Sequence, residues 1–411
     1  MLKKAIFYII TFLGGYVCFA QPSVERNLDY QYDPIPNISC KYIVLDEDDS
    51  LKIYATFHIK RLEGQNARFL SPSRFEIRYN VFADYLNPTV LFGDSLYRMK
   101  TNFKPDKAQI WFSFKVHKPS APSAVLFISV HDNELDETTQ FDIPLVINKS
   151  TVGQYYGIFT SKGKEPLFAN YFTVKDTVQF RKMTDRYQKL IVFRYNYDFD
   201  PAAPPMQYIP RPNKEMQIDC VFSVRADSPL RFKKAAFYFV QEDTTTTEGF
   251  SFTVKEFKYP KLSRAKELIG PLAYITKNEE YEELVRSKFP KLAVDDFWQN
   301  FGNNDQNAKK QIKLFYSRAE KANELFTSFK DGWKTDMGMI YIMYGKPSRV
   351  IRQFDKEFWT YVTANNSQII FTFDRKPTIF TPKNFELERE KYYETSYLSN
   401  VQQWRKGLPP K

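Results

Sequence analysis

Short runs of aromatic and β-branched residues, separated by turn residues, fill the chain from about residue 41 to residue 260. In "KIYATFHI", Lys52–Ile59, apolar side chains alternate with smaller or polar ones, which is the period of a strand with one buried face. We therefore predict a multidomain, mainly β protein with two β-sandwich (Ig-like) domains at residues 21–150 and 151–260. The Pro-rich stretch at residues 200–212 is predicted to be a loop inside the second domain.

The hydrophobic period changes after Pro260. From there the spacing becomes helical, and one apolar stripe repeats every three or four positions. The residues of this stripe are Ile312, Phe315, Ala319, Ala322 and Phe326. Gly332 follows the stripe, where a helix that ends in a left-handed conformation favours a residue without a Cβ.

Three apolar segments come next and predict a three-stranded meander. They are Met339–Tyr344, Glu357–Val362 and Ile369–Phe373. The helical period then returns, and Gly407 is predicted to stop the last helix. Its apolar face consists of Leu387, Tyr392, Tyr397, Leu398, Val401 and Trp404. Residues 261–411 are thus predicted to form an α+β domain of helix, meander and helix, separable from the β-domains.

The first residues of the chain have the features of a secretory signal. Lys3 and Lys4 precede the apolar run Ala5–Leu13. We predict a signal peptide at residues 1–20, cleaved between Ala20 and Gln21. The protein is then exported, and it is periplasmic, associated with the cell envelope, or secreted.

A lipid anchor on Cys18 is the alternative, although the bulky Tyr16 lies where a lipidation signal requires small residues. No later stretch is apolar over the length that a membrane span needs. Cys40 and Cys220 remain after cleavage. Export would permit a disulfide between them, but they fall in different predicted domains, so both the bridge and two separate thiols stay open.

The formal net charge of +11 is spread along the chain rather than concentrated on one element. Nucleic-acid binding requires clustered Lys and Arg, so we expect no nucleic-acid partner. A basic surface of this kind fits contact with an acidic envelope.

The stretch "DGWKTDMGMIYIMYGKP", residues 331–347, resembles the GWxTD-domain family of Gram-negative bacterial envelopes. The match rests on residues 332–336 and then Gly338 and Pro347. Further similarity lies at Phe297-Trp298, Phe315–Phe326, Phe358–Tyr361 and Trp404–Gly407, so that it covers about residues 260–411. Met337 and Met339 depart from the family, which tends to carry basic residues there. The resemblance implies a fold and an exported setting but no established activity.

The candidate site consists of the motif residues Gly332, Trp333, Thr335, Asp336 and Gly338. Two interpretations of these residues are open. In the first, they form a structural corner, because Thr and Asp close turns on backbone N–H groups and Trp supplies a large apolar body. Trp333 then packs on the 312–326 stripe, and Asp336 binds N–H groups of its own corner. In the second, Thr335 or Asp336 serves a ligand.

Residues 261–411 contain no His and no Cys, which excludes Cys/His and Ser/His catalysis and thiolate or imidazole zinc sites in that domain. His58, His117 and His131 lie in the first domain without metal-ligand spacing. We expect no catalytic residue, metal or cofactor.

Two functions from different classes remain. The first is a non-catalytic exported envelope protein that binds envelope protein or glycan partners. The alternative is a carboxylate-dependent hydrolase of an envelope polymer, with its site near Asp336. Its carboxylates would come from Asp331, Asp336, Asp355, Glu357 and Asp374.

Overall fold

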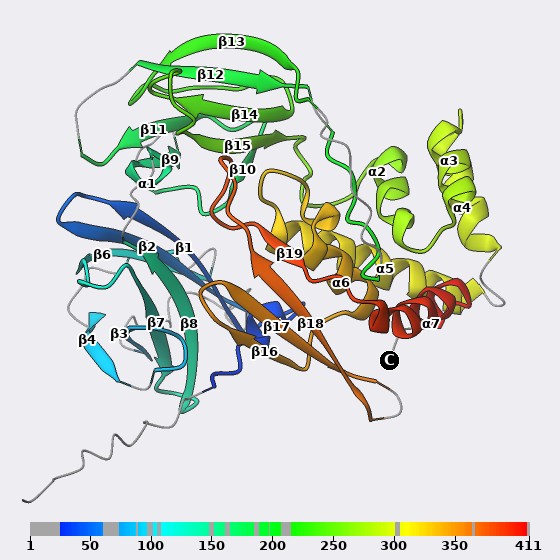
Figure 1. Ribbon diagram of the computed structural model, residues 1–411, viewed down its shortest axis with the longest axis horizontal. Coiled ribbons are helices and arrows are strands. Elements are labelled where there is room, and N and C mark those ends of the chain that lie inside the picture. Colours follow the sequence, from blue (N-terminus) through cyan, green and yellow to red (C-terminus); the bar gives the residue numbers. More distant parts are fainter. Residues whose placement is uncertain are drawn as a thin grey trace, which may run out of the picture.

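The computed structural model (Figure 1) describes most of the chain and is mainly β. It describes residues 25–60, 74–87, 89–96, 102–104, 108–147, 152–160, 165–184, 189–196, 198–206, 215–300, 305–363 and 366–408. The side chains of residues 102–104, 152–153 and 305–308 are not among the described parts. The predicted signal peptide at residues 1–20, with Cys18 and the cleavage position, lies outside the described residues.

Two antiparallel four-stranded sheets form the first β-domain. One has the order β1 (Ile38–Asp46), β2 (Ser50–Ile59), β6 (Gln109–His117) and β5 (Asn102–Lys104). The other has the order β4 (Val90–Ser95), β3 (Phe75–Phe82), β7 (Ser123–Asp132) and β8 (Glu137–Val146). The alternating side chains of both sheets meet in one core, in which Phe57, Phe112 and Leu126 are fully buried.

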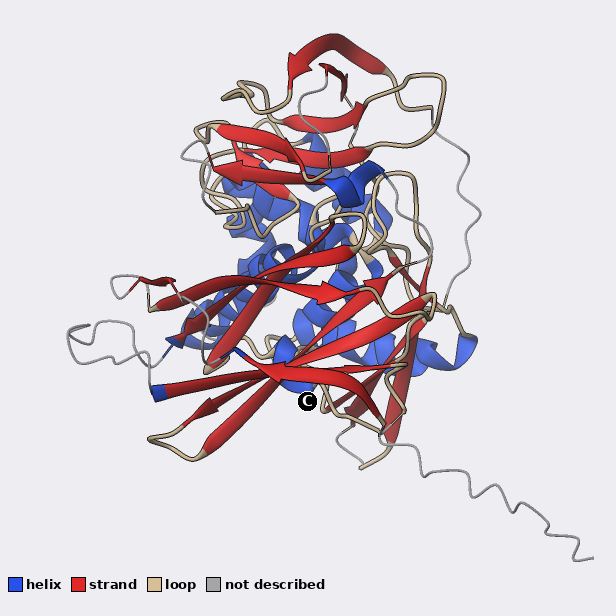
Figure 2. Cartoon of the chain, turned by 90° about the vertical axis from the view of Figure 1, so that its left-hand side faces the viewer, coloured by secondary structure: helices blue, strands red, loops and turns tan. Residues whose placement is uncertain are grey.

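The second β-domain has a five-stranded and a two-stranded sheet. The larger sheet has the order β10 (Tyr171–Thr173), β15 (Phe250–Lys255), β14 (Ala236–Gln241), β12 (Lys189–Tyr195) and β13 (Ile218–Arg225). Strand β9 (Tyr156–Thr160), which follows the short helix α1 (Val152–Tyr155), pairs with β11 (Val178–Lys182). The two sheets share a core that includes Phe180, Val192 and Phe252. The two β-domains lie at the bottom and the top of Figure 2.

Helices dominate the first half of the C-terminal part. They are α2 (Ala265–Ile269), α3 (Asn278–Arg286), α4 (Pro290–Gln299), α5 (Asp305–Phe326) and α6 (Asp336–Tyr344). The predicted stripe is confirmed on α5: Phe315, Ala319 and Ala322 are fully buried, and Ile312 and Phe326 pack against the same core. A four-stranded antiparallel sheet and helix α7 (Glu394–Arg405) follow. The strands are β16 (Arg349–Arg352), β17 (Lys356–Val362), β18 (Gln368–Arg375) and β19 (Phe385–Leu387).

The predicted strand Met339–Tyr344 is wrong, because these residues belong to helix α6. Residues 336–343 are buried all round, so the helix shows no polar face. A short run that is apolar on every side has the same appearance in a buried strand and in a buried helix. The meander therefore consists of β16, β17 and β18, extended by β19.

The N-terminal segment completes the C-terminal core rather than only that of the first β-domain. Leu28 and Tyr32 are buried in the same core as Trp333 and Trp359. The Leu28 N–H donates to the Val350 carbonyl at 2.9 Å, so the segment runs beside β16.

No described helix is long and apolar enough to cross a membrane. Cys40 on β1 and Cys220 on β13 are both free thiols.

Candidate functional site

The two glycines of the motif allow backbones to approach closely. A Cβ on Gly332 would lie 2.0 Å from the Ala322 carbonyl oxygen, and one on Gly338 would lie 1.9 Å from the Gly332 carbonyl oxygen. Gly332 was predicted to end a helix in a left-handed conformation, and this is wrong. Helix α5 already ends at Phe326, and Gly332 begins a short 3-10 turn that is pressed against α5.

The Trp333 side chain is buried at the structural corner that the motif forms, and 6% of the surface of Trp333 is exposed. Its indole lies over Gly270, where a Cβ would come within 2.6 Å of Cζ2, and it meets the Tyr274 ring edge-on at 6.1 Å. The backbone N–H of Trp333 donates to Asn323 Oδ1 of α5 at 3.1 Å. Trp333 thus shares the core of the predicted stripe and contacts the segment that follows α2.

Thr335 caps helix α6. Its Oγ1 accepts the Gly338 N–H at 2.9 Å and donates to the Gly332 carbonyl at 2.7 Å. The first bond satisfies one of the N–H groups that a helix start leaves free, and the second closes the preceding turn.

Asp336 binds a distant strand, so the prediction that it binds N–H groups of its own corner is wrong. Its Oδ2 accepts the Leu387 N–H of β19 at 2.8 Å. Its Oδ1 accepts from Arg389 Nη2 at 2.6 Å. Both oxygens are therefore occupied, and Asp336 and Arg389 have only 10% and 16% of their side chains exposed. The pair fastens the start of α6 to β19.

The same corner holds the Pro-rich loop of the second β-domain. Arg389 Nη2 donates to the Ala203 carbonyl at 3.2 Å, and the Glu390 N–H donates to the Pro205 carbonyl at 3.1 Å. Lys334 forms an ion pair with Asp198 at the start of this loop. The motif thus joins α5, α6, β19 and the loop, so its polar groups are used in holding the fold together.

Three of the other four carboxylates of the predicted pool also face cations. Asp331 pairs with Lys255, and Asp374 pairs with Lys356 at 3.0 Å. Glu357 accepts from Arg352 Nε at 2.8 Å. Asp355 lies in the turn between β16 and β17, where its carbonyl accepts the Arg375 N–H. Among the described residues, no three His, Cys, Asp or Glu side chains are grouped as a metal site would require.

A buried charge cluster joins the first β-domain to the C-terminal sheet. Arg352 Nη1 donates to both oxygens of Asp142 on β8, at 2.7 and 2.6 Å. Tyr85 also donates to Asp142, at 2.7 Å. Burial alone would raise the pKa of Asp142, but Arg352 and the hydrogen bonds from Gln31 and Tyr85 outweigh burial and hold that pKa below its ordinary value. The cluster was not predicted, since its members are far apart in the sequence.

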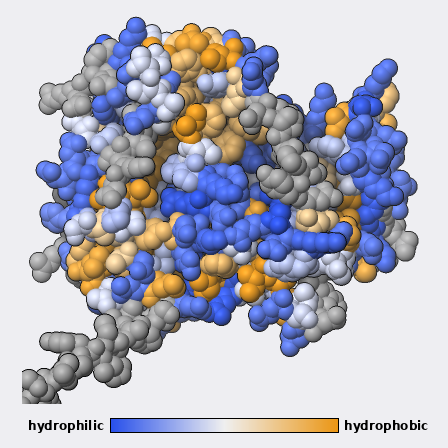
Figure 3. Space-filling model, in the orientation of Figure 1, coloured by the Kyte–Doolittle hydropathy of each residue, from blue (hydrophilic) through white to orange (hydrophobic). Residues whose placement is uncertain are grey.

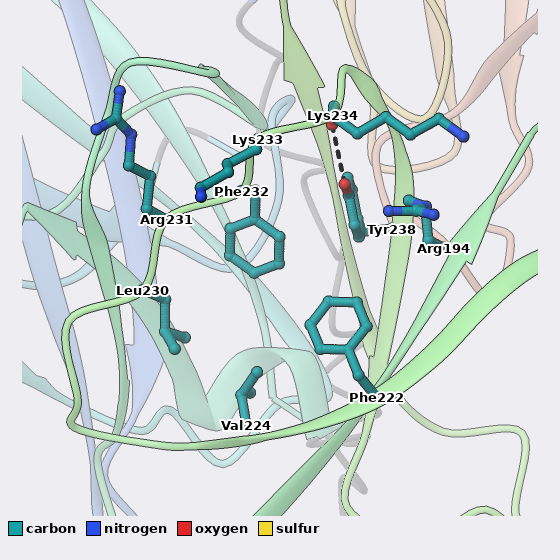
Figure 4. A pocket seen from close by; sticks show the side chains of 9 residues that line it. All are labelled: Arg194, Phe222, Val224, Leu230, Arg231, Phe232, Lys233, Lys234 and Tyr238. Carbon is teal, nitrogen blue, oxygen red and sulfur yellow. Dashed lines mark hydrogen bonds between the residues drawn. The ribbon is translucent and has the colours of Figure 1, made fainter.

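A pocket of about 300 Å³ opens in the second β-domain, and sequence reasoning did not find it either (Figure 4). Its apolar wall consists of Phe222, Val224, Leu230, Phe232 and Tyr238, and its cations are Arg194, Arg231, Lys233 and Lys234. Asp219 accepts from Arg194 and Lys234, both at 2.6 Å. The hydrogen bonds from Lys234 and Arg194 hold the pKa of Asp219 below its ordinary value.

A family model described as the GWxTD domain matches residues 236–406. This part of the chain is therefore a GWxTD domain, and the resemblance drawn from the motif is confirmed. The match begins at β14, inside the second β-domain, and reaches the end of α7.

Among curated proteins, none matches the chain. Among solved structures, a C-terminal 282-residue fragment of intimin in complex with the translocated intimin receptor (Tir) intimin-binding domain is 9% identical. The alignment covers 86% of this chain and 94% of that one at a TM-score of 0.15, so it carries no argument about this protein.

Proposed function

We propose that this is a non-catalytic, exported protein of the cell envelope that binds a protein or glycan partner. The observation that carries the proposal is the pocket of the second β-domain, in which an apolar wall lies beside four cations, two of them shared with Asp219. Aromatic residues and Arg are enriched in binding sites, and this pocket contains both. The motif, in contrast, has its acceptor oxygens occupied by Leu387 and Arg389.

The first β-domain is proposed to be an Ig-like module. Its strand order, β1-β2-β6-β5 opposite β4-β3-β7-β8, corresponds to the A-B-E-D and C′-C-F-G sheets of such modules. The charge cluster at Asp142 and Arg352 would hold the module in a fixed position relative to the GWxTD domain.

The alternative is a carboxylate-dependent hydrolase of an envelope polymer with its site near Asp336. It requires Asp336 and a second carboxylate to face a substrate. The ion pair with Arg389 opposes this role, because a paired and buried carboxylate is not available as a general base.

Crosslinking in intact cells tests the interaction role. A lysine-reactive crosslinker samples the whole basic surface, so a partner should give a discrete product of higher mass that identifies it. Detection of the chain only as an uncrosslinked monomer would contradict the proposal.

Mass spectrometry of the mature chain tests export. A start at Gln21 is expected, whereas an intact Met1 or a lipid on Cys18 would contradict soluble export.

A further inference from the structure

Strand β13 forms an edge of the five-stranded sheet. It pairs with β12 on one side, and no other strand in the described part of the chain pairs with it. It spans eight residues, and Val221 is 52% exposed in its middle. Long apolar edges attract further strands, because their outer N–H and C=O groups lack partners. Figure 3 shows hydrophobic surface gathered at the top of the molecule, where Figure 1 places β12 and β13.

The pocket opens beside this edge. Phe222 and Val224 of β13 face it, while Val221 points to the opposite face of the strand. Across the pocket, Leu230 and Phe232 come from the connection between β13 and β14 (Figure 4). Its volume of about 300 Å³ is at the low end for small-molecule sites, which favours a single large side chain as the occupant.

The charges at the pocket favour an acidic occupant. Arg194 and Lys234 share Asp219, which leaves this trio with a net positive charge. Arg231 and Lys233 pair with no carboxylate within the described ranges. Arg231 Nε donates to the Val174 carbonyl at 3.4 Å, so a bound carboxylate would meet the Nη groups of Arg231 and the ammonium group of Lys233 at the rim.

We propose that β13 accepts an extended acidic segment of a partner protein as an added strand. One apolar side chain of that segment enters the pocket, and acidic side chains two residues before and after it meet Arg231 and Lys233. This inference rests on the proposed interaction role and names the chemistry of the partner. Main-chain hydrogen bonds to β13 would supply affinity, and the pocket would supply specificity, as in other cases of strand addition.

An acyl chain with an anionic head could also fill an apolar pocket with a basic rim. The strand is favoured because an acyl chain would leave the outer main-chain groups of β13 without partners. A segment paired to β13 also places alternate side chains on the pocket face, at the spacing of Phe222 and Val224.

The purified full-length mature chain should bind a set of nine-residue peptides. Each peptide carries Phe, Tyr or Leu at its central position, Val at the two adjacent positions, and Glu at the two positions beyond these. Gln in place of both Glu residues should weaken binding about tenfold, since the charge-assisted bonds are lost. Ala in place of the central residue should abolish measurable binding. Fluorescence anisotropy measures all three.

Backbone pairing is tested with two peptides that are N-methylated at alternate residues, one in each phase. In a strand, only every second N–H points to the neighbouring strand. Strand addition therefore predicts that one phase loses binding and the other retains it. Equal binding of both phases, or equal loss, would overturn the proposal. Hydrogen exchange at β13 should slow only in the presence of the binding peptides.

The double variant Arg231→Glu/Lys233→Glu should weaken peptide binding at least about tenfold through like-charge repulsion. The matched control is Lys288→Glu/Lys291→Glu, a double reversal near α4 that lies far from the pocket in sequence and should leave binding unchanged. Decanoate is the probe for the competing ligand, an acyl chain with an anionic head. If decanoate binds and none of the peptides binds, the occupant of the pocket is an anionic amphiphile and strand addition is wrong.

The two proposals fail in distinguishable ways. If crosslinking in cells captures a partner and no peptide binds, strand addition is wrong and the interaction role stands. If the peptides bind as expected but cells yield no crosslinked product, the surface chemistry is right and the proposed role of the protein is wrong.

Discussion

Asp336 lies where helix α6 and strand β19 of the GWxTD domain meet the Pro-rich loop of the second β-domain. Its two oxygens satisfy the Leu387 N–H and the Arg389 guanidinium, and Arg389 in turn holds the loop at Ala203. A change at this one side chain leaves a largely buried cation without its counterion. Its effect should therefore be on stability rather than on a reaction.

We expect Asp336→Ala to lower the free energy of unfolding by about 3 kcal/mol, the cost of leaving one partner of a buried pair uncompensated. Thermal and urea melts measure the loss. Glu283→Ala, at an exposed position of α3, is the matched control and should stay within ~0.5 kcal/mol of the parent. An Asp336→Ala protein of unchanged stability that has lost a hydrolytic activity would instead support the alternative function.

Trp333→Ala should cost ~3–5 kcal/mol, because it leaves a cavity between Gly270, Tyr274 and α5. Trp333→Phe fills part of that cavity and should cost less. Calorimetry of the three proteins gives the order directly. Equal stability of the Ala and parent proteins would show that the indole does not support the corner.

At the scale of the element, helix α6 depends on how it begins. Its sequence is apolar on every side, so amphipathic patterning does not distinguish it from a strand. The Thr335 side chain accepts the Gly338 N–H, and Gly338 allows the turn before the helix to lie against it. The N-cap hydrogen bond of Thr335 and the close packing at Gly338 together favour the helix over a strand.

Thr335→Ala should therefore destabilise the protein by about 1 kcal/mol, the usual value of an N-cap hydrogen bond. Thr335→Ser keeps the hydroxyl and should recover most of the loss, whereas Thr335→Val keeps the shape without the acceptor and should not. Urea unfolding of the three variants tests this order. Equal losses for Ser and Val would refute the capping role.

At the scale of the whole molecule, the first β-domain is joined to the GWxTD domain through Asp142 and Arg352. Arg352 has 14% of its side chain exposed, and Asp142 has none. Tyr32, from the segment before β1, packs on Trp359 at 4.8 Å within the same junction. A junction of buried charge and aromatic contact resists hinge motion more than a flexible linker would.

The lowered pKa of Asp142 predicts how this junction responds to acid. Because the folded pKa lies below that of the unfolded chain, the ion pair contributes fully above about pH 4 and is lost as the pH falls through the folded pKa. Asp142→Asn should cost about 2 kcal/mol at pH 7 and should lose less stability than the parent when the pH is lowered below about 4.

Melts between pH 7 and pH 3 measure this difference. Asp136→Asn is the matched control, because the Asp136 side chain is 98% exposed and Asn also tolerates its positive φ. The control should follow the parent at every pH. If Asp142→Asn showed the same acid dependence as the parent, Asp142 would not be the titrating group of the junction.

The sequence by itself determined the features that depend on near neighbours. The alternation in Lys52–Ile59 specifies a half-buried strand, and the stripe on α5 specifies the face that the helix buries. The motif Gly332–Asp336 indicates the GWxTD domain, and the family model matches residues 236–406 around it. Each of these signals is local, since strand and helix periods and caps act over a few residues.

The tertiary structure alone decided what depends on distant partners. Asp336 binds Leu387 and Arg389, which lie 51 and 53 residues further along the chain. Helix α6 was mistaken for a strand because its surroundings bury it on every side. The pocket beside β13 arises where a strand edge meets the loop that follows it. Such contacts follow from how the chain folds back on itself, and no local period or propensity encodes them.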